Sequence, residues 1–167
     1  MRESITYLCT LLTEQKVVLE GLLKLAVEEQ TVIIEGNFTK LEEIVRTQLK
    51  QLNTLKQIEK KRATLHELIA SKLGMSSQDL TVSIIADKVT SEQGAQIRQI
   101  QSQLMSVIDK HGEINAENRE LINAHLEYSQ LMLELMIESD DPLNNLYGGD
   151  GRAAPDKKST GFFNGQA

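Results

Sequence analysis

The sequence predicts an all-α protein, built as an elongated antiparallel helical bundle or coiled coil of three long helices, with a short connecting helix and a disordered C-terminal tail. Large apolar residues recur at alternating steps of three and four along three long segments, which is the spacing of a helical seam. Both prolines lie beyond residue 138, where this periodicity stops. Aromatic residues make up only 4% of the chain, which argues against a large enclosed pocket.

The first two long helices are expected to form an antiparallel hairpin, because only a short loop separates them. The first should end at Gly36-Asn37, residues that tolerate the left-handed turn closing a helix. Its seam consists of Ile5, Leu8, Leu12, Gln15, Leu19, Leu22, Ala26, Glu29 and Ile33. The second should begin near Thr39 and close at Gly74. Its seam consists of Leu41, Val45, Gln48, Leu52, Leu55, Glu59, Arg62, His66, Ile69 and Leu73.

Residues 75–90 are expected to form a small connecting helix capped by Ser77, with a brief strand as the alternative. A third long helix should follow from about residue 92 to residue 137, with Ser91 as its cap and a length of roughly 70 Å at 1.5 Å per residue. Its seam consists of Ile97, Ile100, Leu104, Val107, His111, Ile114, Asn118, Leu121, His125, Tyr128, Met132 and Leu135. The predicted domains are therefore a bundle at residues 1–138 and a flexible tail at residues 139–167.

The tail contains two apolar spots, and apolar residues in a disordered tail are candidates for docking on a partner protein. The first spot is Leu143, Leu146 and Tyr147, and the second is Phe162 and Phe163. For the two phenylalanines, an equally good interpretation is that they have no binding role.

Charge and composition favour a protein or peptide partner. The net charge is −6 with the acids spread along the chain, whereas a nucleic-acid-binding protein needs a clustered basic surface. The single cysteine, Cys9, cannot form an internal disulfide and is interpreted as a small apolar residue on a helix. Charged residues come too early for a signal peptide, and no stretch approaches the roughly 20 apolar residues that span a bilayer. A cytoplasmic protein without membrane insertion is expected.

The sequence contains no recognisable catalytic or cofactor-binding motif. His66, His111 and His125 all fall on seam positions, where a hydrogen-bonded neutral imidazole is commoner than a catalytic one. None of them has Glu three residues before it, which is the arrangement that holds two metal ions in a helical bundle. We therefore predict no catalytic residue, no metal and no cofactor, and expect that the chain is not an enzyme.

Polar residues interrupt two of the seams. His111, Asn118 and His125 recur at a spacing of seven, an arrangement that fixes helix register at a cost in stability. Glu59 and Arg62 lie three residues apart on the second seam, where the simplest interpretation is a half-exposed ion pair. All five are predicted to be structural.

The apolar surface of the last helix widens towards its end, from an arc of about 140° to one of about 240° when residues are placed at 100° intervals. Leu126, Leu133 and Ile137 open a second stripe there. The residues expected to continue the bundle face are Tyr128, Leu131, Met132 and Leu135. The first two helices could bury this end on more sides, but helices of roughly 33 and 35 residues cannot flank one of 46 along its whole length. The second stripe is therefore expected to bind a partner.

Five segments, in this order and spacing, carry a resemblance to a known family. They are LTEQKVVLEGLLKLAVEEQ, IEGNFTKLEEI, QIEKKRATLHELIASKLG, NAENRELINAHLEYSQ and LYGGDG, and they span about residues 5–151. The chain resembles the flagellar export chaperones of the FlgN type, which are small all-helical cytoplasmic proteins that guard the hook-filament junction subunits before export. Asn37 stands where Asp is commoner in that family.

The resemblance implies that the C-terminal part of the long helix binds the amphipathic C-terminal helix of a hook-associated client, prevents its premature assembly and delivers it to the export gate. The implied client site is Leu126, Ser129, Met132, Leu133, Met136 and Ile137. Tyr147 is the implied contact with the export gate or the client. The alternatives from other classes are a structural coiled-coil protein that forms a homodimer through the same face, and a helical enzyme, for which no residue can be nominated.

Overall fold

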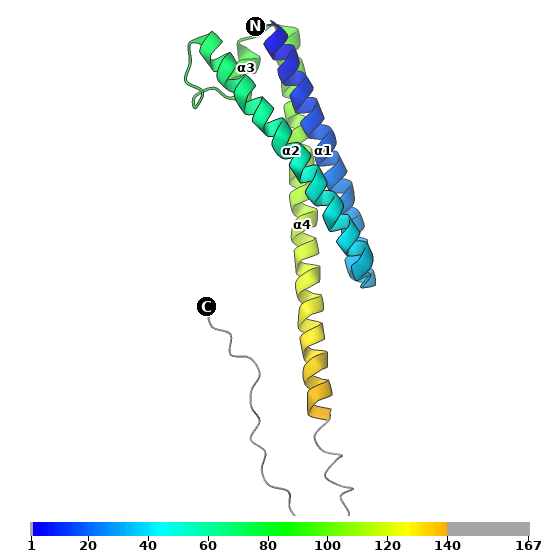
Figure 1. Ribbon diagram of the computed structural model, residues 1–167. Coiled ribbons are helices and arrows are strands. Elements are labelled where there is room, and N and C mark those ends of the chain that lie inside the picture. Colours follow the sequence, from blue (N-terminus) through cyan, green and yellow to red (C-terminus); the bar gives the residue numbers. More distant parts are fainter. Residues whose placement is uncertain (1, 140–167) are drawn as a thin grey trace, which may run out of the picture. The chain divides into compact units, whose positions relative to one another are not determined.

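The computed structural model describes residues 2–139, with side chains as far as residue 137, and it confirms the all-α fold. The four helices within this range are α1 (Arg2–Glu35), α2 (Phe38–Leu73), α3 (Val82–Asp87) and α4 (Ser91–Ser139), and no strand accompanies them (Figure 1). The chain divides into two compact units, residues 1–125 and 126–167, and α4 runs across the boundary. The predicted tail lies outside the described residues, apart from Ser139 at its start.

The turn between α1 and α2 forms where the sequence predicts it. Gly36 has a φ of 67°, in the left-handed region that favours glycine. Its N–H donates to Ile33 O over 3.1 Å and the N–H of Asn37 donates to Val32 O over 3.1 Å, which closes α1 in a Schellman motif. The Asn37 side chain then accepts from the N–H of Lys40 over 3.1 Å and so caps α2, which begins at Phe38.

The end of α2 is also as predicted, because Gly74 adopts a φ of 67° and closes the helix. The two predicted caps that follow are wrong. Thr81, and not Ser77, caps α3 by accepting from the N–H of Ile84 over 3.2 Å. The N-terminus of α4 is capped by Thr90 instead of Ser91, since its hydroxyl oxygen accepts from the N–H of Gln93 over 3.4 Å and also donates to the Gln93 side chain. Sequence position alone cannot separate neighbouring hydroxyl residues that compete for one cap.

The core of the first unit is a single cluster of buried apolar side chains drawn from all four helices. Helix α1 supplies more of it than any other helix, and every apolar position of its predicted seam is buried. The buried core residues on α2, α3 and α4 with the loop before α3 are Ile58, Leu65, Ile69, Ala70, Leu80, Ile85, Ala86, Ile97, Ile100 and Leu104. The seam prediction is thus confirmed for α1 and for the first part of α4.

The predicted seam of α2 is partly wrong. Val45 and Leu52 are 38% and 47% exposed, and the buried residues at this end and in the middle of the helix are Ile44 and Ile58 instead. The second half of the predicted seam is right, because Ile69 is fully buried and Leu55 and Leu73 pack against the core. Helix α2 carries two apolar stripes, and the periodicity does not show which of them packs against α1.

Polar bonds tie α1 to its two neighbours. Lys16 donates to Gln103 over 3.0 Å and Gln30 to Glu117 over 2.7 Å, with the same sequence separation of 87 in both pairs. Helices α1 and α4 therefore run parallel and in register over about four turns. On the α2 side, Gln48 donates to Glu29 over 2.8 Å, as expected for an antiparallel hairpin.

Helix α3 packs closely on the first turn of α4. Gly94 is buried, and a Cβ at this position would collide with the carbonyl oxygen of Ala86. Asp87 accepts from Arg98 over 2.7 Å beside this contact. Gly112, farther along α4, has open space where its Cβ would lie. A side chain is therefore sterically excluded at Gly94 but not at Gly112.

We predict opposite effects for alanine at these two glycines. Gly94→Ala should lower the free energy of unfolding by about 1–3 kcal/mol, because the new methyl group meets backbone that cannot rotate away. Gly112→Ala should raise it by about 0.5–1 kcal/mol, since alanine restricts the unfolded chain and favours helix. Urea denaturation followed by circular dichroism checks both values. Equal effects of the two substitutions would contradict the proposed α3–α4 contact.

Candidate protein-binding surface

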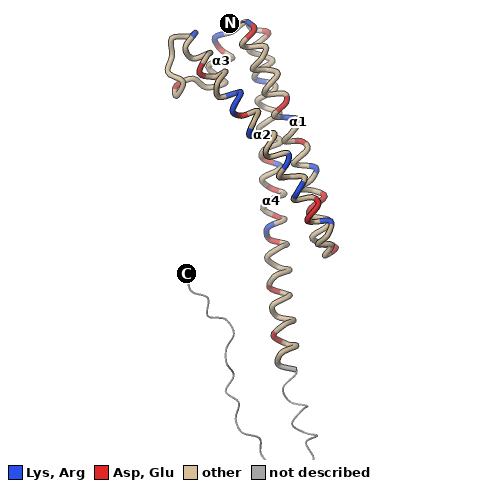
Figure 2. Tube along the Cα trace, in the orientation of Figure 1, with Lys and Arg blue, Asp and Glu red and all other residues tan. Residues whose placement is uncertain are grey.

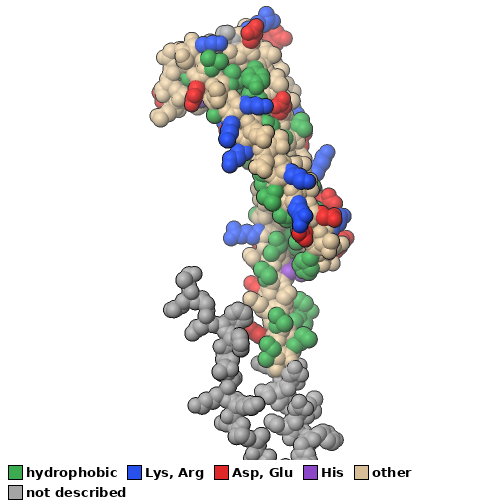
Figure 3. Space-filling model, viewed as in Figure 1, with side chains coloured by type: hydrophobic (Ala, Val, Ile, Leu, Met, Phe, Trp, Pro, Cys, Tyr) green, Lys and Arg blue, Asp and Glu red, His purple; other side chains and the backbone are tan. Residues whose placement is uncertain are grey.

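The last described part of α4 exposes an unusual amount of apolar surface. Every residue from 126 to 137 is exposed. The large apolar residues among them are Leu126, Tyr128, Leu131, Met132, Leu133, Leu135, Met136 and Ile137. Figure 3 shows apolar side chains gathered on this part of α4. We call residues 126–137 the α4 surface. Because soluble proteins rarely expose a contiguous apolar patch of this kind without a use for it, it is the strongest candidate for a binding site.

The apolar residues of the α4 surface cover two sides of the helix. At 100° per residue, Leu126, Leu133 and Ile137 fall on one side, and Tyr128, Leu131 and Leu135 fall nearly opposite. Met132 and Met136 lie between these two stripes. The remaining polar sector is narrow and consists of Glu127, Gln130 and Glu134. A single partner helix cannot cover both stripes at once.

The six residues predicted to bind a client share one face. Met132, Met136, Ser129, Leu133, Leu126 and Ile137 follow one another around α4 within an arc of about 140°. All six are exposed, and Ile137 is the most exposed of the five apolar ones at 71%. An arc of this width matches the apolar face of one amphipathic helix. Their role in binding stays a prediction.

One expectation for this part of α4 is wrong. The bundle face was expected to continue through Tyr128, Leu131, Met132 and Leu135, but all four are exposed. Heptad spacing shows which side chains share a face, but it cannot show whether a neighbouring helix covers that face. Tyr147, Phe162 and Phe163 lie outside the described residues, so their predicted contacts stay predictions.

The polar residues of the predicted α4 seam differ in their environments. Asn118 is only 3% exposed, and its Nδ2 donates to the carbonyl oxygen of Ala26 in α1 over 2.8 Å. Its Oδ1 is buried without a hydrogen-bond partner in the described part of the chain. His111 and His125 are half-buried, and Nδ1 of His111 lies 3.1 Å from Nδ2 of Asn115 one turn away. The hydrogen bond of Asn118 therefore joins α4 to α1.

The other two polar seam residues predicted to be structural, Glu59 and Arg62, lie on α2. Glu59 and Arg62 form a bidentate pair, with Nε of Arg62 2.9 Å from Oε2 of Glu59. The hydrogen bond from Arg62 lowers the pKa of the Glu59 carboxyl from its ordinary value. The pair therefore contributes stability at neutral pH, and this contribution is lost as the pH falls through that lowered pKa. His66 lies one turn further on, with Nε2 2.7 Å from the carbonyl oxygen of Leu80, so this nitrogen carries the proton.

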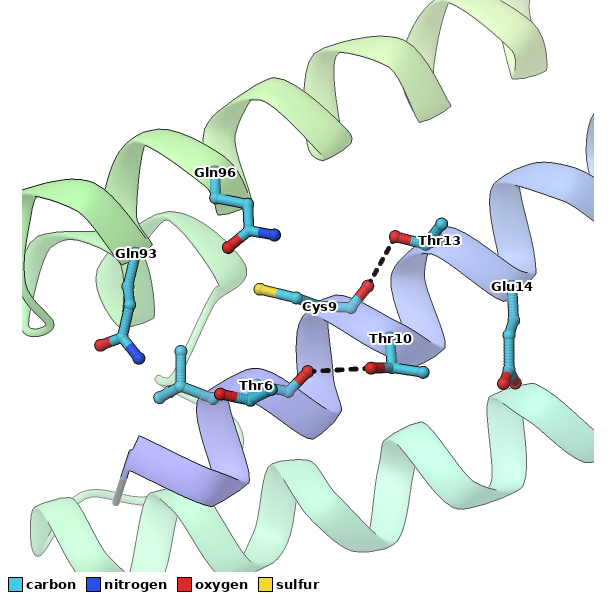
Figure 4. A pocket seen from close by; sticks show the side chains of 8 residues that line it. Thr6, Cys9, Thr10, Thr13, Glu14, Gln93 and Gln96 are labelled. Atoms are coloured by element: carbon cyan, nitrogen blue, oxygen red, sulfur yellow. Dashed lines mark hydrogen bonds between the residues drawn. The ribbon is translucent and has the colours of Figure 1, made fainter.

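A shallow hollow of about 300 Å³ between α1 and α4 surrounds the single cysteine (Figure 4). Cys9 points from α1 towards Gln96 of α4, and burial raises the pKa of its thiol. The hydroxyls of Thr10 and Thr13 donate to backbone carbonyls of α1, over 3.1 and 2.8 Å. A protonated thiol among satisfied hydroxyls offers no activated nucleophile. In residues 2–139, no group of His, Cys, Asp and Glu could hold a metal ion.

Charge is distributed unevenly among the helices (Figure 2). After Arg119, α4 contains no Lys or Arg as far as Ser139, while Glu127 and Glu134 lie within the α4 surface. Helix α2 instead carries most of the basic residues of the bundle, namely Lys40, Arg46, Lys50, Lys56, Lys60, Lys61, Arg62 and Lys72. The α4 surface is thus apolar and acidic. None of the described helices is long and apolar enough to cross a membrane.

A bundle whose most exposed apolar surface lies on one continuous helix has the features of a helical protein that binds other proteins. The particular family follows from comparison with known proteins. The family model described as FlgN protein matches residues 1–155, so the chain belongs to the FlgN family. It is therefore a flagellar export chaperone, and proteins of this family bind hook-associated proteins of the flagellum. No curated protein and no solved structure matches the chain.

The buried bond of Asn118 leads to a test of the polar seam. Asn118→Asp should lower the free energy of unfolding by about 3 kcal/mol or more. A buried carboxylate cannot donate a hydrogen bond to Ala26 O, and its negative charge is repelled by the partial negative charge of that carbonyl oxygen. Asn118→Leu should stay within about 1 kcal/mol of the natural chain, because it removes both the donor and the unpaired Oδ1. Urea denaturation of both variants measures the difference. If leucine costs as much as aspartate, the amide bond itself holds α1 against α4.

Proposed function

We propose that the face of α4 formed by Leu126, Ser129, Met132, Leu133, Met136 and Ile137 binds the amphipathic C-terminal helix of a hook-filament junction protein. The observation that supports this proposal is the exposure of the large apolar residues across the α4 surface. Covering the client helix in the cytoplasm keeps it from assembling early. The bound client is then delivered to the export gate, where Tyr147 contacts the gate or the client.

The binding free energy requires more than the stripe formed by Leu126, Leu133 and Ile137. Fully burying one Leu or Ile side chain contributes roughly 1.5–3 kcal/mol, so Leu126, Leu133 and Ile137 supply at most about 9 kcal/mol. Micromolar binding needs about 8 kcal/mol after the cost of association, which itself consumes several kcal/mol. The flank made by Met132 and Met136 must therefore close on the client as well. Methionine side chains are flexible and adapt to different surfaces, which suits a chaperone with more than one client sequence.

Substitution of two central residues tests the site. Leu133→Asp with Ile137→Asp should weaken binding of the hook-associated proteins from the same genome by at least about 100-fold, because two charges would be buried against apolar surface. Met105→Asp is the matched control, since Met105 lies on the same helix and is 58% exposed, against 59% for Leu133. Isothermal titration calorimetry measures the affinities, and circular dichroism shows that both proteins are folded. Unchanged client binding by the folded double variant would refute the proposed site.

The structural alternative is a homodimer closed through the α4 surface. One observation favours it: a client helix bound to the face of Leu126 and Leu133 would leave the opposite stripe exposed, namely Tyr128, Leu131 and Leu135. Sedimentation over a dilution series distinguishes the two functions. A chaperone should release any self-association when the client helix is added. A tight dimer that stays closed in the presence of client would favour the structural role.

A further inference from the structure

Helix α2 carries a second exposed apolar surface that is separate from the α4 surface. Phe38, Val45, Leu49 and Leu52 are all exposed, and Phe38 is the most exposed at 74%. Their spacing of seven, four and three places them within an arc of about 60°. This arc is separate from Ile44 and Ile58, which are the buried residues in this half of α2 and its middle. We call these four residues the α2 stripe. Steps of seven, four and three are the pattern by which one helix recognises another.

Two lysines continue the same face beyond the α2 stripe. Lys56 follows Leu52 by four residues and Lys60 follows Lys56 by four, so both lie in line with the stripe within about one side-chain width. Neither lysine has an ion-pair partner among the described residues. The neighbouring arginines differ, since Arg46 is bonded to Glu42 over 2.7 Å and Arg62 to Glu59. The positive charge of this face is therefore concentrated on Lys56 and Lys60.

We propose that this face of α2 binds an amphipathic helix of a separate partner protein, with apolar residues packed on the α2 stripe and acidic residues opposite Lys56 and Lys60. The face extends from Phe38 to Lys60, about 33 Å at 1.5 Å per residue, which is six turns of a partner helix. The protein has a net charge of −6, so a face with two lysines prefers an acidic partner, whereas the chain as a whole repels one. The proposed binding face is separate from the α4 surface, and the choice of its occupant rests on the proposed function in one respect, which is that the client covers the α4 surface.

A second copy of α2 is a poorer occupant of this face. A parallel copy places lysine against lysine, which is repulsive. An antiparallel copy offers Glu42 as the acidic residue on this face, and its carboxylate already accepts the bond from Arg46. The α4 surface of a second copy is apolar and acidic, but the proposed function gives that surface to the client. A separate acidic helix satisfies both the stripe and the lysines.

Two designed helical peptides test the proposal with the full chain. Both carry leucines spaced to meet the α2 stripe, followed by residues that face Lys56 and Lys60, which are glutamates in one peptide and lysines in the other. Fluorescence anisotropy should show that the natural chain binds the glutamate peptide at least about 10-fold more tightly. Lys56→Glu with Lys60→Glu should reverse that preference, because the charges then complement the lysine peptide.

Apolar substitutions and controls separate the outcomes. Leu49→Asp with Leu52→Asp should abolish binding of both peptides, whereas Leu133→Asp with Ile137→Asp should leave it unchanged. All six positions are exposed, so circular dichroism should report an unchanged fold for each variant. Failure of the glutamate peptide to bind the natural chain, or equal affinities that charge reversal does not alter, would overturn the proposal. Self-association that Leu49→Asp with Leu52→Asp removes would overturn it in favour of a second copy of the chain.

Discussion

The burial of α1 from two sides is the constraint on which the bundle depends. Consecutive residues of α1 are buried at Leu11 and Leu12 and again at Val32 and Ile33. Neighbouring positions point about 100° apart, so one packing partner cannot cover both. Helix α2 reaches α1 through the tight turn at Gly36, and α4 lies parallel to it through the bonds of Lys16 and Gln30. Both α2 and α4 are therefore positioned against α1.

This arrangement leaves two exposed apolar surfaces with opposite charge. The α2 stripe is continued by Lys56 and Lys60, and the α4 surface contains Glu127 and Glu134. Specificity between partners is a difference in affinity, and a charge that repels the wrong partner contributes as much to it as one that attracts the right partner. Two helices of similar hydrophobicity can thus be directed to different surfaces of one small protein.

Prediction from the sequence succeeded where only one local structure suits the residue. Gly36 and Gly74 ended their helices as expected because both adopt a backbone conformation that other residues rarely take. The α1 seam was right because one broad set of apolar positions was available. Prediction failed where two solutions were nearly equal in energy. Val45 competes with Ile44 for the core, and Ser91 competes with Thr90 for the cap, and only packing or bond geometry decides between them.

The candidate site shows the same division. The apolar widening from Leu126 to Ile137 was visible in the sequence, and its exposure in the structure agrees with that pattern. The exposure of Tyr128 and Leu135 was not predictable, because it depends on which helix covers them and not on their spacing. The α2 stripe was not predicted, because the heptad spacing of Val45 and Leu52 indicates a place in the bundle core.

The charge sequence of α4 has an energetic consequence for its own end. The backbone dipoles of a helix leave negative partial charge at its C-terminus, where basic residues are favourable and acidic ones are not. The last turn of α4 contains no basic residue, and Glu134 lies just before it. A bound helix that brings a lysine or arginine to these turns would neutralise both the carboxylate and the terminal carbonyls. Binding there would then stabilise the last turns of α4 with a charge supplied by the bound helix.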